Sequence, residues 1–269
     1  MKTVLITGAS SGFGKRVAEK LLDEGYPVYA AARRVEKMTD IEEKGAHILR
    51  MDVTDKGSVE AGVAQVIKEQ GKIDVLFNNA GYGSFGPIEC VPMEDIQHQY
   101  EVNVFGMARL IKAILPYMRK KRSGLIINTA SMVGHISFPV MGWYASTKHA
   151  IEGMSDALRM EVKPFGIDVV VIDPGPVKTE FDAVGIASLD RLEQPEEYKP
   201  LTAAFIKYFA NLYAKCPGPE GTADAVVKAI KANRPKTRYA TTTVAKLLPK
   251  IRRWAGDRLF DSMCLRQLK

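Results

Sequence analysis

Short apolar runs alternate with amphipathic stretches along most of the 269-residue chain. Thr3–Thr7, with the sequence TVLIT, is a β-branched and apolar run of the kind found in strands buried on both faces. Similar runs recur along the chain and are followed by polar or small residues that indicate turns. The pattern predicts strands at 3–7, 27–32, 46–51, 73–77, 125–129, 167–172 and 238–242.

Helical periodicity separates these strands. Apolar residues recur at helical spacing from Val17 to Leu22, until Gly25 ends the pattern. Further helices are expected up to about Gln70 and over 92–122, 144–163 and 221–233. Periodicity weakens over 180–219, which we expect to be an excursion that covers a substrate. The alternation predicts one α/β domain over 1–269, a doubly wound parallel sheet of about seven strands with helices on both faces.

Composition narrows the class of protein. With 46% hydrophobic and 26% charged residues, the chain has the balance of an ordinary globular protein. No apolar run approaches the roughly 18 residues of a spanning helix, and the run near Met1 is too short for a signal peptide. Three scattered cysteines, Cys90, Cys216 and Cys264, argue against disulfides. The scattered cysteines suit a reducing compartment, so we expect a cytoplasmic protein. No His, Cys and Asp cluster has metal-ligand spacing, so no bound metal is expected.

The net charge of +7 is concentrated at one end of the chain. Nine basic and two acidic residues lie between 236 and 269, so the preceding part is close to neutral. The basic segment at about 243–269 could make a weak contact with a membrane surface, or it could be the solvated face of a terminal helix. No nucleic-acid partner is expected.

Glycines follow the first predicted strand and precede the first predicted helix. Gly8, Gly12 and Gly14 have the spacing G-x-x-x-G-x-G. Glycines in this context let the backbone approach a pyrophosphate, whose charge then lies at the amino end of the helix. A plain glycine turn is the alternative interpretation.

The second predicted strand ends in Arg33-Arg34 rather than in Asp or Glu. In dinucleotide-binding βαβ units an acidic residue at this place holds the adenosine ribose, whereas an Arg accommodates a 2′-phosphate. The sequence therefore favours NADP, with NADPH preferred over NADH, unless both arginines are only solvent-facing loop charges.

Four polar residues form a candidate catalytic set. Tyr144 and Lys148 are four positions apart in a predicted helix, so they lie on one face and place a tyrosine next to a cation. Such a pair also occurs by chance. Ser131 follows a predicted strand, as Asp52 does, and open α/β sheets bind ligands at the carboxyl ends of strands. Asn103 lies inside a predicted helix, where a poor helix former needs exposure or a partner.

In this order and spacing the motifs resemble those of the short-chain dehydrogenase/reductase family, and look closest to its steroid- and retinol-oxidising members. The resemblance covers about residues 1–180 and rests on the segments TGASSGFG at 7–14, NNAG at 78–81, VNV at 102–104, YASTK at 144–148 and PG at 174–175, with Asp52 and Ser131. It implies a Rossmann sheet with strand order 3-2-1-4-5-6-7. It also implies NADP(H)-dependent interconversion of a ketone or aldehyde and an alcohol, in a homodimer or homotetramer paired through the helices of Asn103 and Lys148.

The resemblance also implies a role for each candidate residue. Tyr144 would be the general acid and base, and Ser131 would bind the substrate oxygen beside it. Lys148 would hold the nicotinamide ribose and, with the oxidised nicotinamide, lower the pKa of Tyr144. Asn103 would hold a water that links Lys148 to solvent. Cofactor contacts are implied for Gly8, Ser10, Ser11, Gly12, Phe13, Gly14, Arg33, Asp52, Val53, Asn79, Gly81, Tyr144, Lys148, Pro174, Val177 and Thr179.

The expected walls of the substrate site are mostly apolar. They include Tyr82, Phe85, Ile136, Phe138, Val140, Met141, Trp143 and Phe181. This composition favours a hydrophobic substrate. His135, between Ser131 and Tyr144, is expected to line the pocket or face solvent. A non-catalytic NADP sensor on the same fold is the alternative function, although such a protein should lack the acid.

Overall fold

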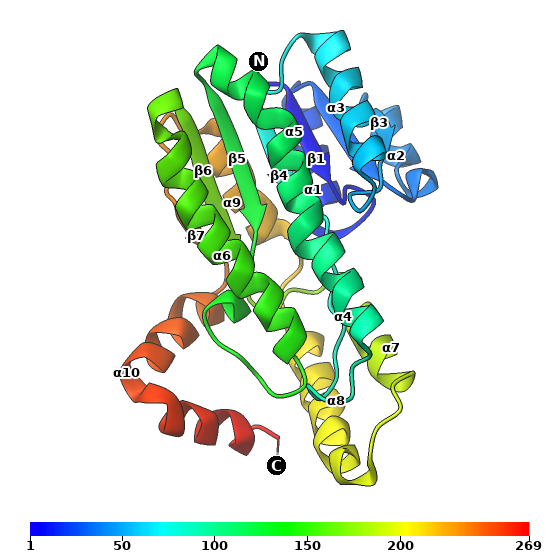
Figure 1. Ribbon diagram of the computed structural model, residues 1–269, viewed down its shortest axis with the longest axis vertical. Coiled ribbons are helices and arrows are strands. Elements are labelled where there is room, and N and C mark those ends of the chain that lie inside the picture. Colours follow the sequence, from blue (N-terminus) through cyan, green and yellow to red (C-terminus); the bar gives the residue numbers. More distant parts are fainter. Residues whose placement is uncertain (269) are drawn as a thin grey trace.

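In the computed structural model, which describes residues 1–268, seven parallel strands form the central sheet (Figure 1). Their order is β3-β2-β1-β4-β5-β6-β7, as the family resemblance implies. The strands are β1 (Val4–Thr7), β2 (Val28–Ala32), β3 (His47–Arg50), β4 (Val75–Asn78), β5 (Gly124–Thr129), β6 (Ile167–Asp173) and β7 (Arg238–Ala240). Every predicted strand is present, with ends shifted by at most two residues.

Helices cover both faces of the sheet. They are α1 (Gly12–Asp23), α2 (Thr39–Glu43), α3 (Lys56–Gln70), α4 (Met93–Tyr100), α5 (Gly106–Lys121), α6 (Gly142–Val162), α7 (Phe181–Asp190), α8 (Lys199–Ala214), α9 (Glu220–Lys231) and α10 (Thr243–Arg266). Shorter helical turns are η1 (Val35–Lys37), η2 (Glu101–Phe105), η3 (Met132–Gly134), η4 (Lys163–Phe165) and η5 (Glu196–Tyr198).

Two apolar layers hold the helices to the sheet. On one face, side chains of α3, α5 and α6 pack against alternate residues of the central strands, among them Leu76 and Ile126. On the other face, α1 and α9 pack against the intervening residues, among them Phe77 and Ile127. Successive strand residues therefore point into opposite layers, and both layers exclude water. This explains why the strand sequences are apolar at consecutive positions.

The predicted helix at 92–122 is a continuous helical stretch with a widened turn inside it. It consists of α4, the π-helical turn η2 and α5. Asn103 lies in this π turn and is fully buried. A π turn interrupts the regular hydrogen bonding of an α-helix and is frequent at functional sites. The π turn at Asn103 therefore indicates that the orientation of this side chain matters.

The segment 180–219, where periodicity weakens, contains α7 and α8. The buried stripe of α8 is Thr202, Phe205, Phe209 and Tyr213, at helical spacing. A third apolar cluster joins this stripe to residues of α6 and α10 beyond the carboxyl ends of the strands.

The basic segment forms α10, which projects from the body of the molecule (Figure 1). Gly256 has φ +71° and ψ 173°, so a kink divides this helix into two arms. Lys269, the last residue of the predicted basic segment, lies outside the described residues. No helix in the described part of the chain has the length and apolar character needed to cross a bilayer.

Candidate active site

A cavity of about 1510 Å³ extends from the glycine turn after β1 to the space between α8 and α10. It lies at the carboxyl ends of the strands, where the sequence places the candidate residues. All of the predicted site residues line it except Gly14 and Asn103. Of the expected substrate walls, the cavity is lined by Tyr82, Ile136, Phe138, Met141 and Phe181.

The glycine turn is too closely packed for side chains. Gly8 has φ +67°, and a Cβ there would lie 2.9 Å from the Cα of Ala80. A Cβ on Gly14 would lie 2.5 Å from the carbonyl oxygen of Gly8, which explains why Gly14 supports the turn without lining the cavity. Asn79 Nδ2 donates to the carbonyl oxygens of Thr7 and Gly8 at 3.2 and 3.3 Å. The bare backbone at the start of α1 fits a pyrophosphate.

Arg33 and Asp52 line the same cavity as the glycine turn. Asp52 Oδ1 accepts hydrogen bonds from the main-chain N and the hydroxyl of Thr54, at 2.9 and 2.8 Å. Burial raises the pKa of Asp52, but these bonds and the nearby Arg33 outweigh it and hold the pKa below its ordinary value. Arg33 is exposed on the rim of the cavity. Within the described residues Arg34 forms an ion pair with Glu180, whereas Arg33 has no carboxylate partner.

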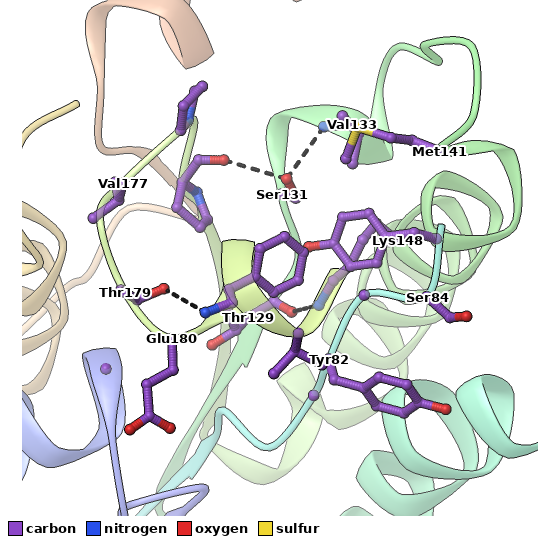
Figure 2. A pocket seen from close by; sticks show the side chains of 18 of the residues that line it. Tyr82, Ser84, Thr129, Ser131, Val133, Met141, Lys148, Val177, Thr179 and Glu180 are labelled. Carbon is purple, nitrogen blue, oxygen red and sulfur yellow. Dashed lines mark hydrogen bonds between the residues drawn. The ribbon is translucent and has the colours of Figure 1, made fainter. Parts of the chain in front are cut away.

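Tyr144 and Lys148 lie together on the buried face of α6, as their spacing predicts. Lys148 Nζ donates to the carbonyl oxygen of Thr129 at 2.9 Å (Figure 2) and lies 5.6 Å from the centroid of the Tyr144 ring. Burial lowers the pKa of Lys148 to about 8, although Asp173 and Glu152 oppose the shift. Burial also raises the pKa of Tyr144, and the neighbouring Ser131 opposes this. Tyr144 is therefore a protonated phenol at neutral pH.

Ser131 follows β5 and lies at the start of η3. Its hydroxyl donates to the carbonyl oxygen of Pro174 at 3.3 Å and accepts from the main-chain N of Val133 at 3.4 Å (Figure 2). Both bonds are long, so the hydroxyl can rotate toward another acceptor at small cost. Ser131 thus joins η3 to the loop that follows β6.

Asn103 anchors the loop that follows β4. Its Oδ1 accepts from the main-chain N of Tyr82 at 3.0 Å, and its Nδ2 donates to the carbonyl oxygen of Tyr82 at 2.9 Å. Nδ2 also donates to the hydroxyl of Thr147 at 3.2 Å. A Cβ on Gly81 would lie 3.1 Å from Asn103 Oδ1 and 3.8 Å from Lys148 Nζ. An Asn inside a helix is expected to need a hydrogen-bond partner. Tyr82 and Thr147 are the partners of Asn103.

The loop after β6 lies against the glycine turn. Thr179 lies against Gly12, because a Cβ on that glycine would be 3.6 Å from Thr179 Cγ2. The next residue, Glu180, pairs with Arg34 and Lys37 at 3.3 Å each. Phe181 then packs against Tyr144, with ring centroids 5.0 Å apart. One short segment therefore connects the Arg33 end of the cavity with the Tyr144 end.

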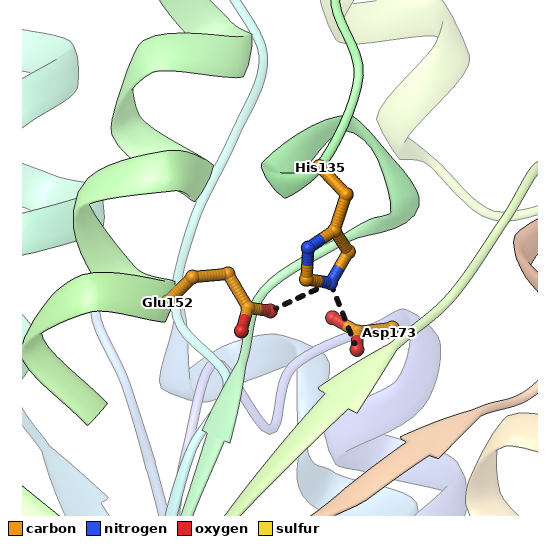
Figure 3. Close-up of side chains that lie close together, drawn as sticks. All are labelled: His135, Glu152 and Asp173. Atoms are coloured by element: carbon orange, nitrogen blue, oxygen red, sulfur yellow. Dashed lines mark hydrogen bonds and ion pairs between the residues drawn. The ribbon is translucent and has the colours of Figure 1, made fainter. Parts of the chain in front are cut away.

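His135, Glu152 and Asp173 form an ionic cluster (Figure 3). His135 Nε2 is 3.4 Å from Glu152 Oε1 and 3.5 Å from Asp173 Oδ2. Arg238 forms a double hydrogen bond with Glu152 Oε2, at 3.0 and 2.8 Å. The hydrogen bond with Asp173 raises the pKa of His135, and burial with the nearby Asp173 raises the pKa of Glu152. The cluster brings negative charge toward Lys148, which helps this buried amine to keep its proton.

His135, Glu152 and Asp173 each offer one atom within 4.8 Å of the others, which is close enough for a metal ion. Arg238 already supplies a cation to Glu152 at this place. The arrangement therefore favours an ion-paired cluster over a metal centre. Two of its members could be found from the sequence, because Glu152 is four positions after Lys148 on the same helical face and Asp173 ends a strand directly before Pro174.

Comparison with known proteins places this architecture in a family. The family model described as short chain dehydrogenase matches residues 2–186. The chain belongs to the short-chain dehydrogenase family. It is 38% identical over 260 residues to a 3-ketodihydrosphingosine reductase of Bacteroides thetaiotaomicron, covering 96% of this chain and 94% of the relative. It is 34% identical over 278 residues to an NADPH-dependent 3-dehydrocapnine reductase of Ornithobacterium rhinotracheale, covering 100% and 98%.

Further similarities agree with this assignment. Human retinol dehydrogenase 8 is 34% identical over 257 residues, covering 89% of this chain and 81% of that protein. Among solved structures, a short chain dehydrogenase/reductase of Burkholderia phymatum in complex with NAD has a TM-score of 0.81 and 26% identity, covering 94% of this chain and 93% of that one. This short-chain dehydrogenase is therefore an oxidoreductase acting on alcohol or carbonyl groups, with a nicotinamide dinucleotide site. The alternative interpretation as a non-catalytic sensor has no support among these relatives.

Proposed function

We propose that this short-chain dehydrogenase reduces a hydrophobic ketone or aldehyde with NADPH, or oxidises the corresponding alcohol, with Tyr144 as general acid and base. The observation that carries the proposal is the convergence of Tyr144, Lys148 and Ser131 on one cavity that also contains the glycine turn. These residues come from separate parts of the sequence, and a purely structural role would not require them to meet at a cavity wall.

The protonated phenol of Tyr144 supports the acid role. In the reducing direction, Tyr144 would donate its proton to the carbonyl oxygen of the substrate. The nicotinamide dinucleotide, when bound, supplies or accepts the hydride. The hydroxyl of Ser131 would rotate away from Pro174 and donate to the same substrate oxygen, where negative charge develops.

Lys148 would stabilise the phenolate of Tyr144 and hold the cofactor. One of its three N–H groups is fixed by Thr129, which leaves two to hold the ribose hydroxyls and face the phenol. Its charge would favour the phenolate whenever Tyr144 has given up its proton. Asn103 would fix the Tyr82 backbone beside Lys148. We also propose that Asn103 holds a water that links Lys148 to solvent.

The cofactor preference is proposed from Arg33. Its exposed side chain lies on the cavity rim near Asp52, and within the described residues no carboxylate is close enough to form an ion pair with it. A 2′-phosphate would provide the missing anion. The NADPH-dependent relative is consistent with this choice.

The substrate class is proposed from the walls beyond Tyr144. Phe138, Phe205 and Leu248 are among the apolar residues that line this part of the cavity. Two of the relatives are named for 3-keto compounds of the sphingosine and capnine classes, and a third for retinol. We therefore propose a lipid-like substrate whose reacting oxygen lies near Ser131 and Tyr144, with its apolar part directed toward α8 and α10.

Assembly and location complete the proposal. The exposed Phe105 and Tyr117, on the α4–α5 stretch, and Met160, on α6, would be covered in a homodimer or homotetramer paired through these helices. A cytoplasmic location agrees with three cysteines that are free thiols. We also propose one dinucleotide-binding domain over 1–269, with a substrate-covering segment at 180–219 and a basic segment at 243–269.

The direct test is a panel of ketones, aldehydes and alcohols with NADPH and NADP. The expected result is a change in absorbance at the reduced nicotinamide band, with a preference for substrates that carry long apolar groups. Turnover confined to small polar carbonyl compounds would contradict the substrate class, and absence of turnover with the whole panel would contradict the proposed reaction.

A further inference from the structure

Helix α10 exposes more large apolar side chains than is usual for a helix that faces water. Trp254 is 87% exposed. The other large apolar residues exposed on this helix are Val244, Leu247, Ile251, Leu259, Met263 and Leu265. They occur on both arms of the helix, before and after the kink at Gly256. Exposed apolar groups concentrated on one element mark an interaction surface.

Basic residues are interspersed with these apolar ones. Over 243–266 there are six basic and two acidic residues, and the exposed basic ones are Lys246, Lys250, Arg253, Arg258 and Arg266. Arg252 pairs with Asp257 across the kink. A helix that combines exposed Trp and Leu with an excess of cations has the composition of helices that lie in a membrane interface.

The cavity connects this surface to Tyr144. Leu247, Ile251 and Met263 are exposed and at the same time line the cavity. The cavity is also lined by residues of α8, namely Phe205, Tyr208, Phe209 and Leu212. The apolar end of the cavity therefore opens at the same surface that carries Trp254 and the cations.

We propose that α10 docks this short-chain dehydrogenase on an anionic lipid surface, and that apolar substrate enters the cavity between α8 and α10 directly from that surface. Charge decides between lipid and a second copy of the chain. Two copies that met through α10 would each bring an excess of four positive charges to the contact, whereas anionic headgroups complement that charge. The entry route rests on the proposed function, but the docking does not.

The docking test uses vesicles of phosphatidylcholine with and without phosphatidylserine. In a Trp143→Phe background, Trp254 is the remaining tryptophan and reports its own environment. We expect the protein to sediment with the vesicles that contain phosphatidylserine and the fluorescence of Trp254 to shift to the blue. Both effects should be lost at high salt. Equal binding to both vesicle types, or binding to neither, would overturn the proposal.

Two variants and a control separate docking from folding. Lys250→Glu with Arg253→Glu is expected to weaken vesicle binding by at least ~30-fold, since each cation contributes about 1 kcal/mol near an anionic surface. Trp254→Ser removes the most exposed anchor and should weaken binding as well. Lys163→Glu with Arg234→Glu, at exposed positions outside α10, changes the net charge by the same amount and is the matched control, which should bind as the native protein does. Native-like vesicle binding by the double variant would overturn the proposal.

A turnover comparison tests the entry route. On a short water-soluble carbonyl substrate, the Lys250→Glu, Arg253→Glu variant should match the native rate, because neither residue lines the cavity. On a long-chain ketone presented in serine-containing vesicles, the variant should be slower by about the factor of its lost binding. Equal rates on the vesicle substrate would overturn the entry route. Vesicle binding without any turnover would instead contradict the proposed function. Dimerisation through α10 without vesicle binding would overturn the docking proposal in favour of a second copy.

Discussion

The ammonium group of Lys148 lies 5.6 Å from the centroid of the Tyr144 ring, and both side chains are buried. Burial shifts their pKa values in opposite directions, upward for Tyr144 and down to about 8 for Lys148. The same apolar surroundings therefore widen the interval between the two pKa values, because burial disfavours the charged form of each group. At neutral pH both groups carry their protons, which is the state that carbonyl reduction requires.

Lys148→Met should weaken cofactor binding and turnover together. The variant loses the charge-assisted donors near the ribose site, so the KM for NADPH is expected to rise by about 10- to 100-fold. The kcat should fall as well, because the phenolate of Tyr144 loses its cation. Steady-state kinetics check both constants, with Lys163→Met as the control from the exposed end of the α6 region. A variant with raised KM but native kcat would show that Lys148 only binds.

Glu152→Gln should move the pH profile of cofactor capture. The kcat/KM for NADPH should decline as pH rises through about 8, because Lys148 then loses its proton. Removing the Glu152 carboxylate withdraws a negative charge that favours the protonated amine, so the decline should shift to lower pH by about half a unit or more. Glu161→Gln, an exposed position on the same helix, should leave the profile in place. A shift of the Glu152→Gln profile to higher pH would contradict the role given to the ionic cluster.

Arg33→Asp should change the choice of cofactor. An aspartate repels a 2′-phosphate and can accept hydrogen bonds from a ribose, so kcat/KM for NADPH is expected to fall by about 10- to 100-fold while that for NADH rises. Initial rates with both cofactors measure the ratio, and Arg234→Asp in the turn before β7 is the matched control. Equal use of both cofactors by the native enzyme would already contradict the preference.

Asn103→Ala should destabilise the fold. The variant leaves the half-buried main-chain N–H and carbonyl groups of Tyr82 without their partner, which costs about 2–4 kcal/mol in unfolding free energy. Urea unfolding measures the loss, and Asn211→Ala, at an exposed position of α8, should cost far less. Equal stabilities of the two variants would show that the Tyr82 loop does not depend on Asn103.

The sequence predicts the sheet well because the strands are apolar at consecutive positions and the glycine turn has a local signature. Ser131, Tyr144 and Lys148 also carry recognisable spacing. Less of the remaining site is predictable, since it depends on contacts between distant segments. The π turn at Asn103 exists where that side chain meets the backbone of Tyr82.

Two other features show the same dependence on distant partners. The stripe Thr202, Phe205, Phe209 and Tyr213 has helical spacing, and it could have indicated α8 within the segment of weak periodicity. Its packing partner Phe85, however, is more than a hundred residues away in the sequence. The cluster of His135, Glu152 and Asp173 likewise forms only because η3, α6 and β6 meet. Spacing within one helix cannot reveal such a meeting.

The most direct test of the proposed chemistry is the Tyr144→Phe variant, which keeps the buried ring and removes the proton. Its kcat for carbonyl reduction should fall by about 10²- to 10⁴-fold, the usual contribution of a general acid. NADPH binding, followed by fluorescence titration, should stay close to native, and Tyr117→Phe on the exposed face of α5 should keep full activity. A Tyr144→Phe enzyme that retains most of the native rate with intact NADPH binding would contradict the assignment of Tyr144 as the proton donor.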